Sequence, residues 1–192
     1  MYSELVKRIR SLLSTQEVVT VAISGHGGSG KSTLAESLAK EFSVTDEQIL
    51  RIDNFHAKDY IKTKDIYEQH EWGELKALLA DARSKHELKY LARDWKGKEH
   101  KICITRPRIL IVEGIRLVRP ELLPYFDVNV WIDCPLEVAT KRAIGRNRLQ
   151  GDSEEEIKLW YTKWLPEAKQ YEEDYHPQKI ADFLYTEYGS IS

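Results

Sequence analysis

A glycine-rich segment near the N-terminus carries the residue types needed to hold a chain of phosphates. It reads Gly25-His26-Gly27-Gly28-Ser29-Gly30-Lys31-Ser32 and continues with Thr33. In such a loop the backbone N–H groups surround the phosphates, Lys31 reaches the β and γ oxygens, and the Ser32 hydroxyl meets Mg²⁺. The helix expected to begin there adds its positive dipole end. The pattern therefore predicts a site for ATP and magnesium.

The same glycines also satisfy a second fingerprint, that of a dinucleotide-binding turn. Gly25, Gly27 and Gly30 have its spacing, and Asp53 lies at about the distance where a ribose-binding acid is expected. This interpretation predicts an NAD-dependent oxidoreductase. It gives no reason for Lys31-Ser32 to follow directly, whereas a nucleoside triphosphate with Mg²⁺ needs both residue types. The phosphate loop is therefore the preferred interpretation, and the NAD enzyme remains an alternative.

Two carboxylates are expected beside this loop, because each follows an apolar, strand-like run. Asp53 follows residues 49–52 and Glu113 follows residues 108–112. Ligands of parallel sheets gather at the carboxyl ends of the strands. Asp53 could therefore orient or deprotonate an acceptor hydroxyl, while Glu113 could hold Mg²⁺ directly or through water. The alternative for each is an acid that caps a turn at the end of a strand.

Short apolar strands alternate with helical stretches along the chain. This pattern predicts a three-layer α/β fold, with a parallel sheet of about five strands and helices on both faces. Strands are expected at residues 18–23, 49–52, 108–112, 128–132 and 181–185. Helical spacing of apolar residues is found over residues 34–42, 75–82, 136–148 and 152–171. A hairpin excursion is expected at about 87–105 and a small lid at about 142–153.

Composition limits the class of protein. The 192 residues are 42% hydrophobic and 31% charged, which predicts a single globular domain over residues 1–192. A net charge of −2 argues against nucleic acid as the main partner, and no apolar run is long enough for a membrane span. Cys103 and Cys134 lie in apolar runs without a metal or disulfide spacing, so both are expected to be buried in the core. Unpaired cysteines suit the reducing cytoplasm, where the protein is expected to reside. The six histidines have no ligand spacing, so no zinc site is predicted.

In their order and spacing, these motifs resemble the uridine kinase-like branch of the P-loop kinases, whose relatives include phosphoribulokinase and pantothenate kinase. Asp53-Asn54-Phe55-His56 is similar to the family's Asp-x-Phe-Tyr, and Val112-Glu113-Gly114-Ile115 is similar to its Val-Glu-Gly-Ile. An arginine-bearing stretch follows later, and the resemblance covers residues 18–185. It implies a P-loop NTPase fold and the transfer of phosphate from ATP to a hydroxyl of a small molecule.

The resemblance also implies roles for individual residues. Asp53 would be the catalytic base and a further candidate ligand of Mg²⁺, with Ser32 and Glu113 as the other ligands. Arg142 and Arg146 would clamp the phosphates from the lid, where they would neutralise charge and exclude water. The alternative for these arginines is an exposed basic face of a helix.

The acceptor is specified less closely by the resemblance. Pyrimidine nucleoside kinases of the family carry Tyr-Asp in the hairpin, whereas this chain has Arg93-Asp94, and His56 replaces the family's tyrosine. Tyr67 lies where the family often places acceptor contacts. A nucleoside is the leading acceptor, while Arg93 would suit the carboxylate or phosphate group of an anionic metabolite. An NAD oxidoreductase, a regulatory module that hydrolyses nucleotides slowly, and a homo-oligomer all stay open.

Overall fold

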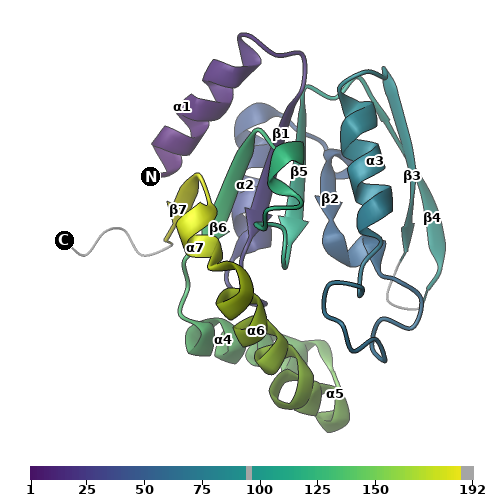
Figure 1. The fold of residues 1–192 in the computed structure, drawn as a ribbon, viewed down its shortest axis with the longest axis vertical. Helices are drawn as coiled ribbons and strands as arrows, with labels where there is room; N and C mark the ends of the chain where they lie inside the picture. Colours follow the sequence, from purple (N-terminus) through teal and green to yellow (C-terminus); the bar gives the residue numbers. More distant parts are fainter. Residues whose placement is uncertain (94–96, 187–192) are drawn as a thin grey trace.

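A five-stranded parallel sheet runs through the centre of the molecule in the order β2-β5-β1-β6-β7 (Figure 1). The computed structural model describes residues 1–93 and 97–186. Its central strands are β1 (Val19–Ser24), β2 (Ile49–Arg51), β5 (Ile109–Gly114), β6 (Val128–Ile132) and β7 (Phe183–Tyr185). Each neighbouring pair is parallel. The predicted α/β class and the predicted number of strands are confirmed.

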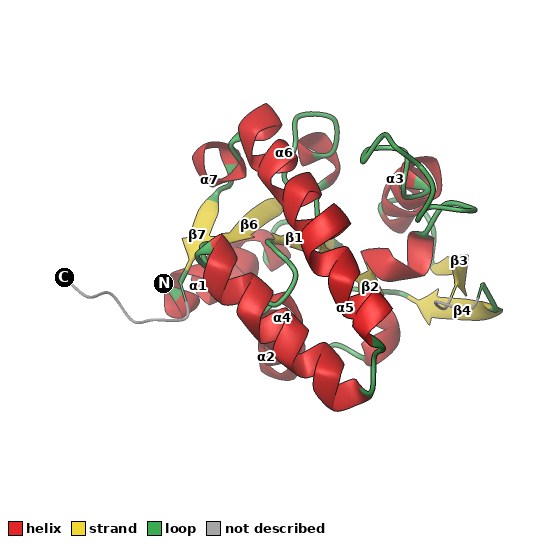
Figure 2. Ribbon diagram, turned by 90° about the horizontal axis from the view of Figure 1, so that it is seen from below, coloured by secondary structure: helices red, strands yellow, loops and turns green. Residues whose placement is uncertain are grey.

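Helices cover both faces of this sheet because successive strand residues point to opposite sides. Val19, Val21 and Ile23 face one core with α1 (Tyr2–Leu13) and α2 (Lys31–Phe42). Ala22 faces a second core with α3 (Trp72–Ala82). Figure 2 shows the helices on either side of the strands. The sheet is thus the middle of three layers, as predicted.

The order of the strands bears on the choice between the two glycine fingerprints. In the dinucleotide-binding fold the second strand lies directly beside the first. Here β5 lies between β1 and β2, and the register pairs Ile23 of β1 with Glu113 of β5. The end of β5 therefore lies directly beside the glycine-rich loop, which places Glu113 rather than the end of β2 next to it.

A second group of helices lies beyond the carboxyl ends of the strands (Figure 1). It consists of α4 (Leu136–Gln150), α5 (Glu154–Leu159) and α6 (Leu165–Tyr175), and a short α7 (Pro177–Ile180) leads back to β7. Ser153 caps α5 by a capping box with Glu156. A π-helical turn, Trp160–Trp164, joins α5 to α6 without a break, and Pro166 lies in the first turn of α6, directly after the π-helical turn. These helices close the sheet's carboxyl edge.

The predicted hairpin is confirmed as β3 (Glu87–Arg93) and β4 (Glu99–Thr105), which pair in antiparallel fashion beside α3. Only one face of this two-stranded ribbon packs on the core, through Leu88 and Ile104. Cys103, next to Ile104, therefore points outward and is exposed, and Cys134 is half-buried. The prediction that both cysteines are buried is wrong. Among the described helices, none combines the length and the apolar character needed to cross a membrane.

Candidate active site

The glycine-rich loop joins β1 to α2 and has a shape that only glycine tolerates at two positions. Gly28 and Gly30 have φ values of 82° and 99°, a region that favours residues without a side chain. A Cβ atom on Gly28 would also lie 2.2 Å from the carbonyl oxygen of Ala139 in α4. The loop therefore keeps its backbone close to α4 and presents N–H groups at the start of α2.

Lys31 and Ser32 open α2 and lie in the positions expected of phosphate and magnesium contacts. The Lys31 ammonium group donates a hydrogen bond to the carbonyl oxygen of His26 at 2.8 Å, so its side chain lies back along the loop. The Ser32 hydroxyl donates to Glu113 Oε1 at 3.1 Å. A hydroxyl oxygen and a carboxylate side by side form the hard oxygen donor set that Mg²⁺ prefers. Ser32 and Glu113 therefore fit a magnesium ion.

Asp53 lies near Glu113 because the ends of β2 and β5 approach closely. It belongs to a 3₁₀ turn, Ile52–Phe55, that follows β2 directly. A Cβ atom on Gly114 would lie 1.9 Å from Ile52 Cγ2, so the glycine after Glu113 leaves room for this turn. The Asp53 motif and the Glu113-Gly114 motif therefore depend on each other sterically. The turn that carries Asp53 packs directly on Gly114.

The charges of these groups influence one another. Burial raises the pKa of the Glu113 carboxyl, which the positive charge of Lys31 opposes. Loss of water contact also raises the pKa of Asp53, although its side chain is open to the cavity, and the charges of Lys31 and Arg146 oppose the shift. Burial lowers the pKa of Lys31, against the attraction of both carboxylates. The two acids and two cations therefore form one electrostatic unit.

A cavity of about 230 Å³ extends from the phosphate loop past Asp53 to the π-helical turn Trp160–Trp164 and helix α6. The loop end carries Lys31, Ser32, Glu113 and Arg146. The side away from the loop is lined by His56, Tyr60, Gln69, His70, Ile115, Arg116, Trp164, Leu165, Glu167, Ala168 and Tyr171, and Trp160 lies over the loop itself. Asp53 lies between Lys31 and Glu113 on one side and His56 and His70 on the other. The side away from the loop is called the acceptor end, because the kinase resemblance implies an acceptor there.

The predicted residues divide into two groups. His56 and Arg146 line the cavity with the loop and both acids, whereas Arg142, on the same helix as Arg146, is not among its described lining residues. Tyr67 is also absent from that lining, and its hydroxyl donates to Asp174 of α6 at 2.7 Å. Arg93 donates to Glu74 of α3 and to Glu99 of the hairpin. It is not among the described residues that line the cavity. Asp94 lies outside the described residues.

Several lining residues were not singled out as site residues from the sequence, and three of them, Gln69, Arg116 and Glu167, form a buried polar network. Arg116 donates to Glu167 Oε2 at 2.7 Å, to Gln69 Oε1 at 2.8 Å and to the carbonyl oxygen of Ile66 at 2.8 Å. Arg116 and Glu167 are 4% and 8% exposed, so the network ties α6 to the turn after β5. Its one sequence signal is an arginine two residues after Gly114.

Two tryptophans of the π-helical turn line the cavity. Trp160 and Trp164, predicted from their helical spacing to pack in a core or interface, form an edge-to-face pair with ring centroids 4.8 Å apart and line the cavity. A Cβ atom on Gly27 would lie 2.6 Å from the Trp160 ring. The π-helical turn therefore places an aromatic surface directly over the phosphate loop.

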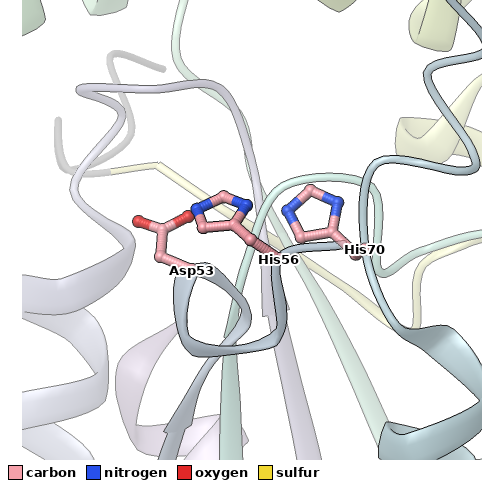
Figure 3. Close-up of side chains that lie close together, drawn as sticks. All are labelled: Asp53, His56 and His70. Carbon is pink, nitrogen blue, oxygen red and sulfur yellow. The ribbon is translucent and has the colours of Figure 1, made fainter. Parts of the chain in front are cut away.

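His56 and His70 lie side by side next to Asp53 (Figure 3), with ring centroids 5.0 Å apart. Both rings are buried, at 9% and 5% exposure. Burial lowers the pKa of His56 to about 4 and that of His70 well below its ordinary value of 6.5. Both imidazoles are therefore neutral at pH 7, so this part of the cavity offers hydrogen-bonding groups without a positive charge.

The lowered pKa of His56 predicts a loss of stability in acid. Between pH 6.5 and about 4 the unfolded chain binds a proton at His56 and the folded protein does not, so the unfolding free energy falls as the pH falls. The full shift corresponds to a loss of about 3 kcal/mol. We expect the unfolding free energy of His56→Asn to fall less than that of the parent protein between pH 6.5 and about 4. Urea unfolding at a series of pH values measures both.

The raised pKa values of Asp53 and Glu113 have the opposite effect, since they raise the unfolding free energy as the pH falls. Both acids are present in the parent and in His56→Asn, so their effects cancel in the comparison. His86→Asn is the control because His86 is exposed, and its curve should follow that of the parent protein. Parallel curves for His56→Asn and the parent would show that His56 titrates normally in the folded protein.

Together, the strand order, the loop at the start of α2 and the paired Ser32 and Glu113 define a P-loop nucleotide-binding protein. Residues 2–112, more than half of the chain, match the family model described as the NB-ARC domain. The chain therefore belongs to the NB-ARC domain family. The matched segment contains the phosphate loop and Asp53 and ends within β5.

A uridine kinase and two candidate kinases resemble the chain over most of its length. A uridine kinase of Shewanella pealeana is 22% identical over 184 residues, which are 83% of this chain and 87% of that protein. A candidate fructose transport system kinase from Silicibacter has a TM-score of 0.74 at 21% identity, covering 96% of this chain and 98% of the other. A candidate uridine kinase from Bacillus stearothermophilus has a TM-score of 0.64 at 21% identity, over 95% and 99%. The predicted resemblance to P-loop small-molecule kinases is confirmed.

Proposed function

We propose that this protein transfers the γ-phosphoryl group of ATP, bound with Mg²⁺, to a hydroxyl group of a small metabolite. The observation that carries the proposal is the position of Asp53. Its carboxylate faces the same cavity as Lys31, Ser32 and Glu113, between the phosphate loop and an end lined by aromatic rings, neutral polar groups and the Arg116–Glu167 ion pair. Phosphoryl transfer requires this arrangement of a cradled phosphate, a metal site and a base near the acceptor.

Each group then has a defined part in the reaction. The acceptor oxygen forms a bond to the γ-phosphorus as the bond from that phosphorus to the β–γ bridging oxygen breaks, and ADP leaves. The hydroxyl proton passes to Asp53, which lies at the end of β2 beside the phosphate end of the cavity. Lys31 and Arg146 stabilise the negative charge on the transferred group, and Ser32 with Glu113 would hold the magnesium ion, which would add positive charge beside the phosphates.

The neutral character of the acceptor end favours an uncharged acceptor, with a nucleoside as the leading candidate. Arg116 already donates to three acceptors of the protein and so has little capacity left for a substrate carboxylate. Trp164 and Tyr60 offer ring surfaces on which a base or a sugar ring can pack. The relative from Shewanella pealeana is a uridine kinase, which also supports a nucleoside. An anionic acceptor recognised by Arg93 is the rival proposal.

Binding measurements separate the kinase from the NAD oxidoreductase. We expect ADP with Mg²⁺ to raise the melting temperature of the protein and NAD⁺ to leave it unchanged, since ligand binding to the folded state alone stabilises it. ATP and GTP are compared in the same assay. A shift produced by NAD⁺ and not by ADP with Mg²⁺ would contradict the proposal.

An acceptor screen separates the kinase from a regulatory module. ADP release is measured with ATP, Mg²⁺ and each of a set of nucleosides, hexoses, sugar acids and pantothenate. We expect release to rise at least tenfold with an uncharged acceptor, and most with a nucleoside. Slow ATP hydrolysis that no acceptor stimulates would favour the regulatory module, and stimulation by the acids alone would favour the anionic acceptor.

A further inference from the structure

Three residues at the centre of the cavity form a cluster of metal-binding type. One ligand atom of each of Asp53, His56 and His70 lies within 4.8 Å of the others. Figure 3 shows the Asp53 carboxylate beside the His56 ring and the His70 ring next to it. All three residues line the cavity, so an ion at this position could also bind water or substrate.

The local backbone explains why Asp53 and His56 lie on the same side. They are three residues apart, and the chain between them forms the 3₁₀ turn Ile52–Phe55. Residues three apart in a 3₁₀ helix eclipse each other, because that helix has three residues per turn. The turn therefore presents the carboxylate and the first imidazole in one direction.

A short antiparallel bridge brings His70 to the same place. The Ala57 N–H donates to the carbonyl oxygen of Gln69 at 3.0 Å, and the Glu71 N–H donates to that of Phe55 at 2.7 Å. His56 and His70 lie directly opposite each other between these two bonds. Such a non-hydrogen-bonded pair has its side chains on one face and unusually close together. The backbone thus holds the two imidazoles side by side.

The His70 ring points to a ligand for a second, independent reason. It is 5% exposed, yet neither of its ring nitrogens makes a hydrogen bond with any described residue. A buried polar atom without a partner costs free energy, and native proteins rarely leave one. A ring nitrogen that binds a metal ion would remove this cost.

We propose that Asp53, His56 and His70 form a binding site for a divalent transition-metal ion such as Zn²⁺. Two imidazoles and a carboxylate suit Zn²⁺, Co²⁺ or Ni²⁺, whereas Mg²⁺ prefers oxygen ligands alone. Metal–ligand bonds of about 2.1 Å place the ligand atoms of a tetrahedral ion about 3.4 Å apart, so the side chains close on the ion by roughly an ångström. The histidine spacing in the sequence predicts no zinc site. Spacing alone does not reveal the backbone bridge that brings His56 and His70 together.

This site is distinct from the magnesium position at Ser32 and Glu113, although Asp53 lies beside both. The packing around the imidazoles supports a fixed orientation, since Tyr60 stacks on His56 at 4.0 Å and Trp72 packs on His70 at 5.0 Å between ring centroids. Where the proposed function holds, a bound Zn²⁺ engages the carboxylate that accepts the proton and is expected to inhibit transfer. The binding itself does not depend on that function.

Co²⁺ is the probe that tests the site directly. The full-length protein in excess Mg²⁺ is titrated with CoCl₂, and the visible absorption is recorded, with ZnCl₂ used to displace the ion. We expect one Co²⁺ per chain, with an absorption stronger than that of the hydrated ion. His70→Asn is expected to weaken the binding at least tenfold, because loss of a ligand costs no less than loss of a group that orients one. His86→Asn, at an exposed histidine, should bind as the parent does.

A cooperative urea unfolding transition like that of the parent shows that a variant is folded, and His56→Gln serves in place of His70→Asn where the latter fails this check. Unchanged absorption of Co²⁺ on addition of the parent protein would overturn the proposal. Equal affinities of the parent and of both folded histidine variants would do so too. A failure of phosphoryl transfer with Co²⁺ binding intact would count against the proposed function alone.

Discussion

Replacing Asp53 with asparagine is expected to reduce the turnover number for acceptor phosphorylation by about 10³-fold, within the range found for removal of a general base. Asparagine keeps the shape of the side chain but cannot take the acceptor's proton. The raised pKa of Asp53, which burial causes and Lys31 and Arg146 oppose, brings the carboxyl closer to the range in which a base works at neutral pH.

The measurement is acceptor-dependent ADP release at saturating ATP, Mg²⁺ and acceptor. Calorimetric binding of ADP with Mg²⁺ should stay within about twofold of the parent, because Lys31, Ser32 and Glu113 are unchanged. Asp59→Asn is the control, since Asp59 is exposed and pairs only with the nearby Lys62, three residues further along the chain, among the ion pairs of the described residues. A parent-like rate in Asp53→Asn would remove the base assignment. A loss of ADP binding equal to the loss of rate would instead make Asp53 a magnesium ligand.

The phosphate end of the site could be predicted because its determinants are local. The loop is one continuous segment whose glycines, lysine and serine all act where they stand in the chain. Asp53 and Glu113 were predicted by one further step, since the carboxyl ends of parallel strands meet at one edge of a sheet. That step needs only the positions of two strands, and β2 and β5 lie within a few residues of their predicted bounds.

The acceptor end could not be predicted in the same way, because it depends on contacts between distant segments. His56 and His70 meet through two backbone hydrogen bonds in a loop without apolar periodicity. Arg116 meets Glu167 from 51 residues away. The spacing of Trp160 and Trp164 predicts packing on one face of a helix, and it does not say that this face covers a cavity.

Arg93 shows a further limit of reasoning from a motif. The resemblance places it in the acceptor site, but the register of the hairpin pairs it with Glu99, and the packing of the hairpin on α3 adds Glu74. Its charge is therefore engaged by the protein. Arg93, Asp94 and Tyr67 stay predictions as acceptor contacts, as does Arg142 as a phosphate contact, while Arg146 has the cavity lining in its favour.

Replacing Glu167 with leucine is expected to lower the free energy of unfolding by about 3–5 kcal/mol, the usual cost of breaking a buried ion pair from one side. Glu167 accepts hydrogen bonds from Arg116 at 2.7 Å and Gln69 at 2.9 Å and pairs with Lys163 at 2.7 Å. Leucine has a similar volume but accepts none of these bonds. The charge of Arg116 would then stay buried, with Gln69 and the Ile66 carbonyl oxygen as its acceptors.

Urea unfolding measures this loss, with Glu173→Leu as the matched control. Glu173 lies on the same helix and is exposed, so its replacement should change the unfolding free energy by no more than about 0.5 kcal/mol. Equal effects of the two leucine variants would show that the buried pair contributes nothing to stability.

A double variant, Arg116→Met with Glu167→Leu, tests whether the loss comes from the unpaired charge. Replacing both partners of a buried pair by apolar residues of similar volume is often neutral, since neither partner is left as a buried, unpaired charge. Lys163 also loses its contact with Glu167, but its side chain is 17% exposed and so reaches water. We therefore expect the double variant to recover most of the stability lost in Glu167→Leu. If it is as unstable as the single variant, the cost comes from the packing of α6 on the turn after β5, and the network serves to hold that helix over the cavity by shape rather than by charge.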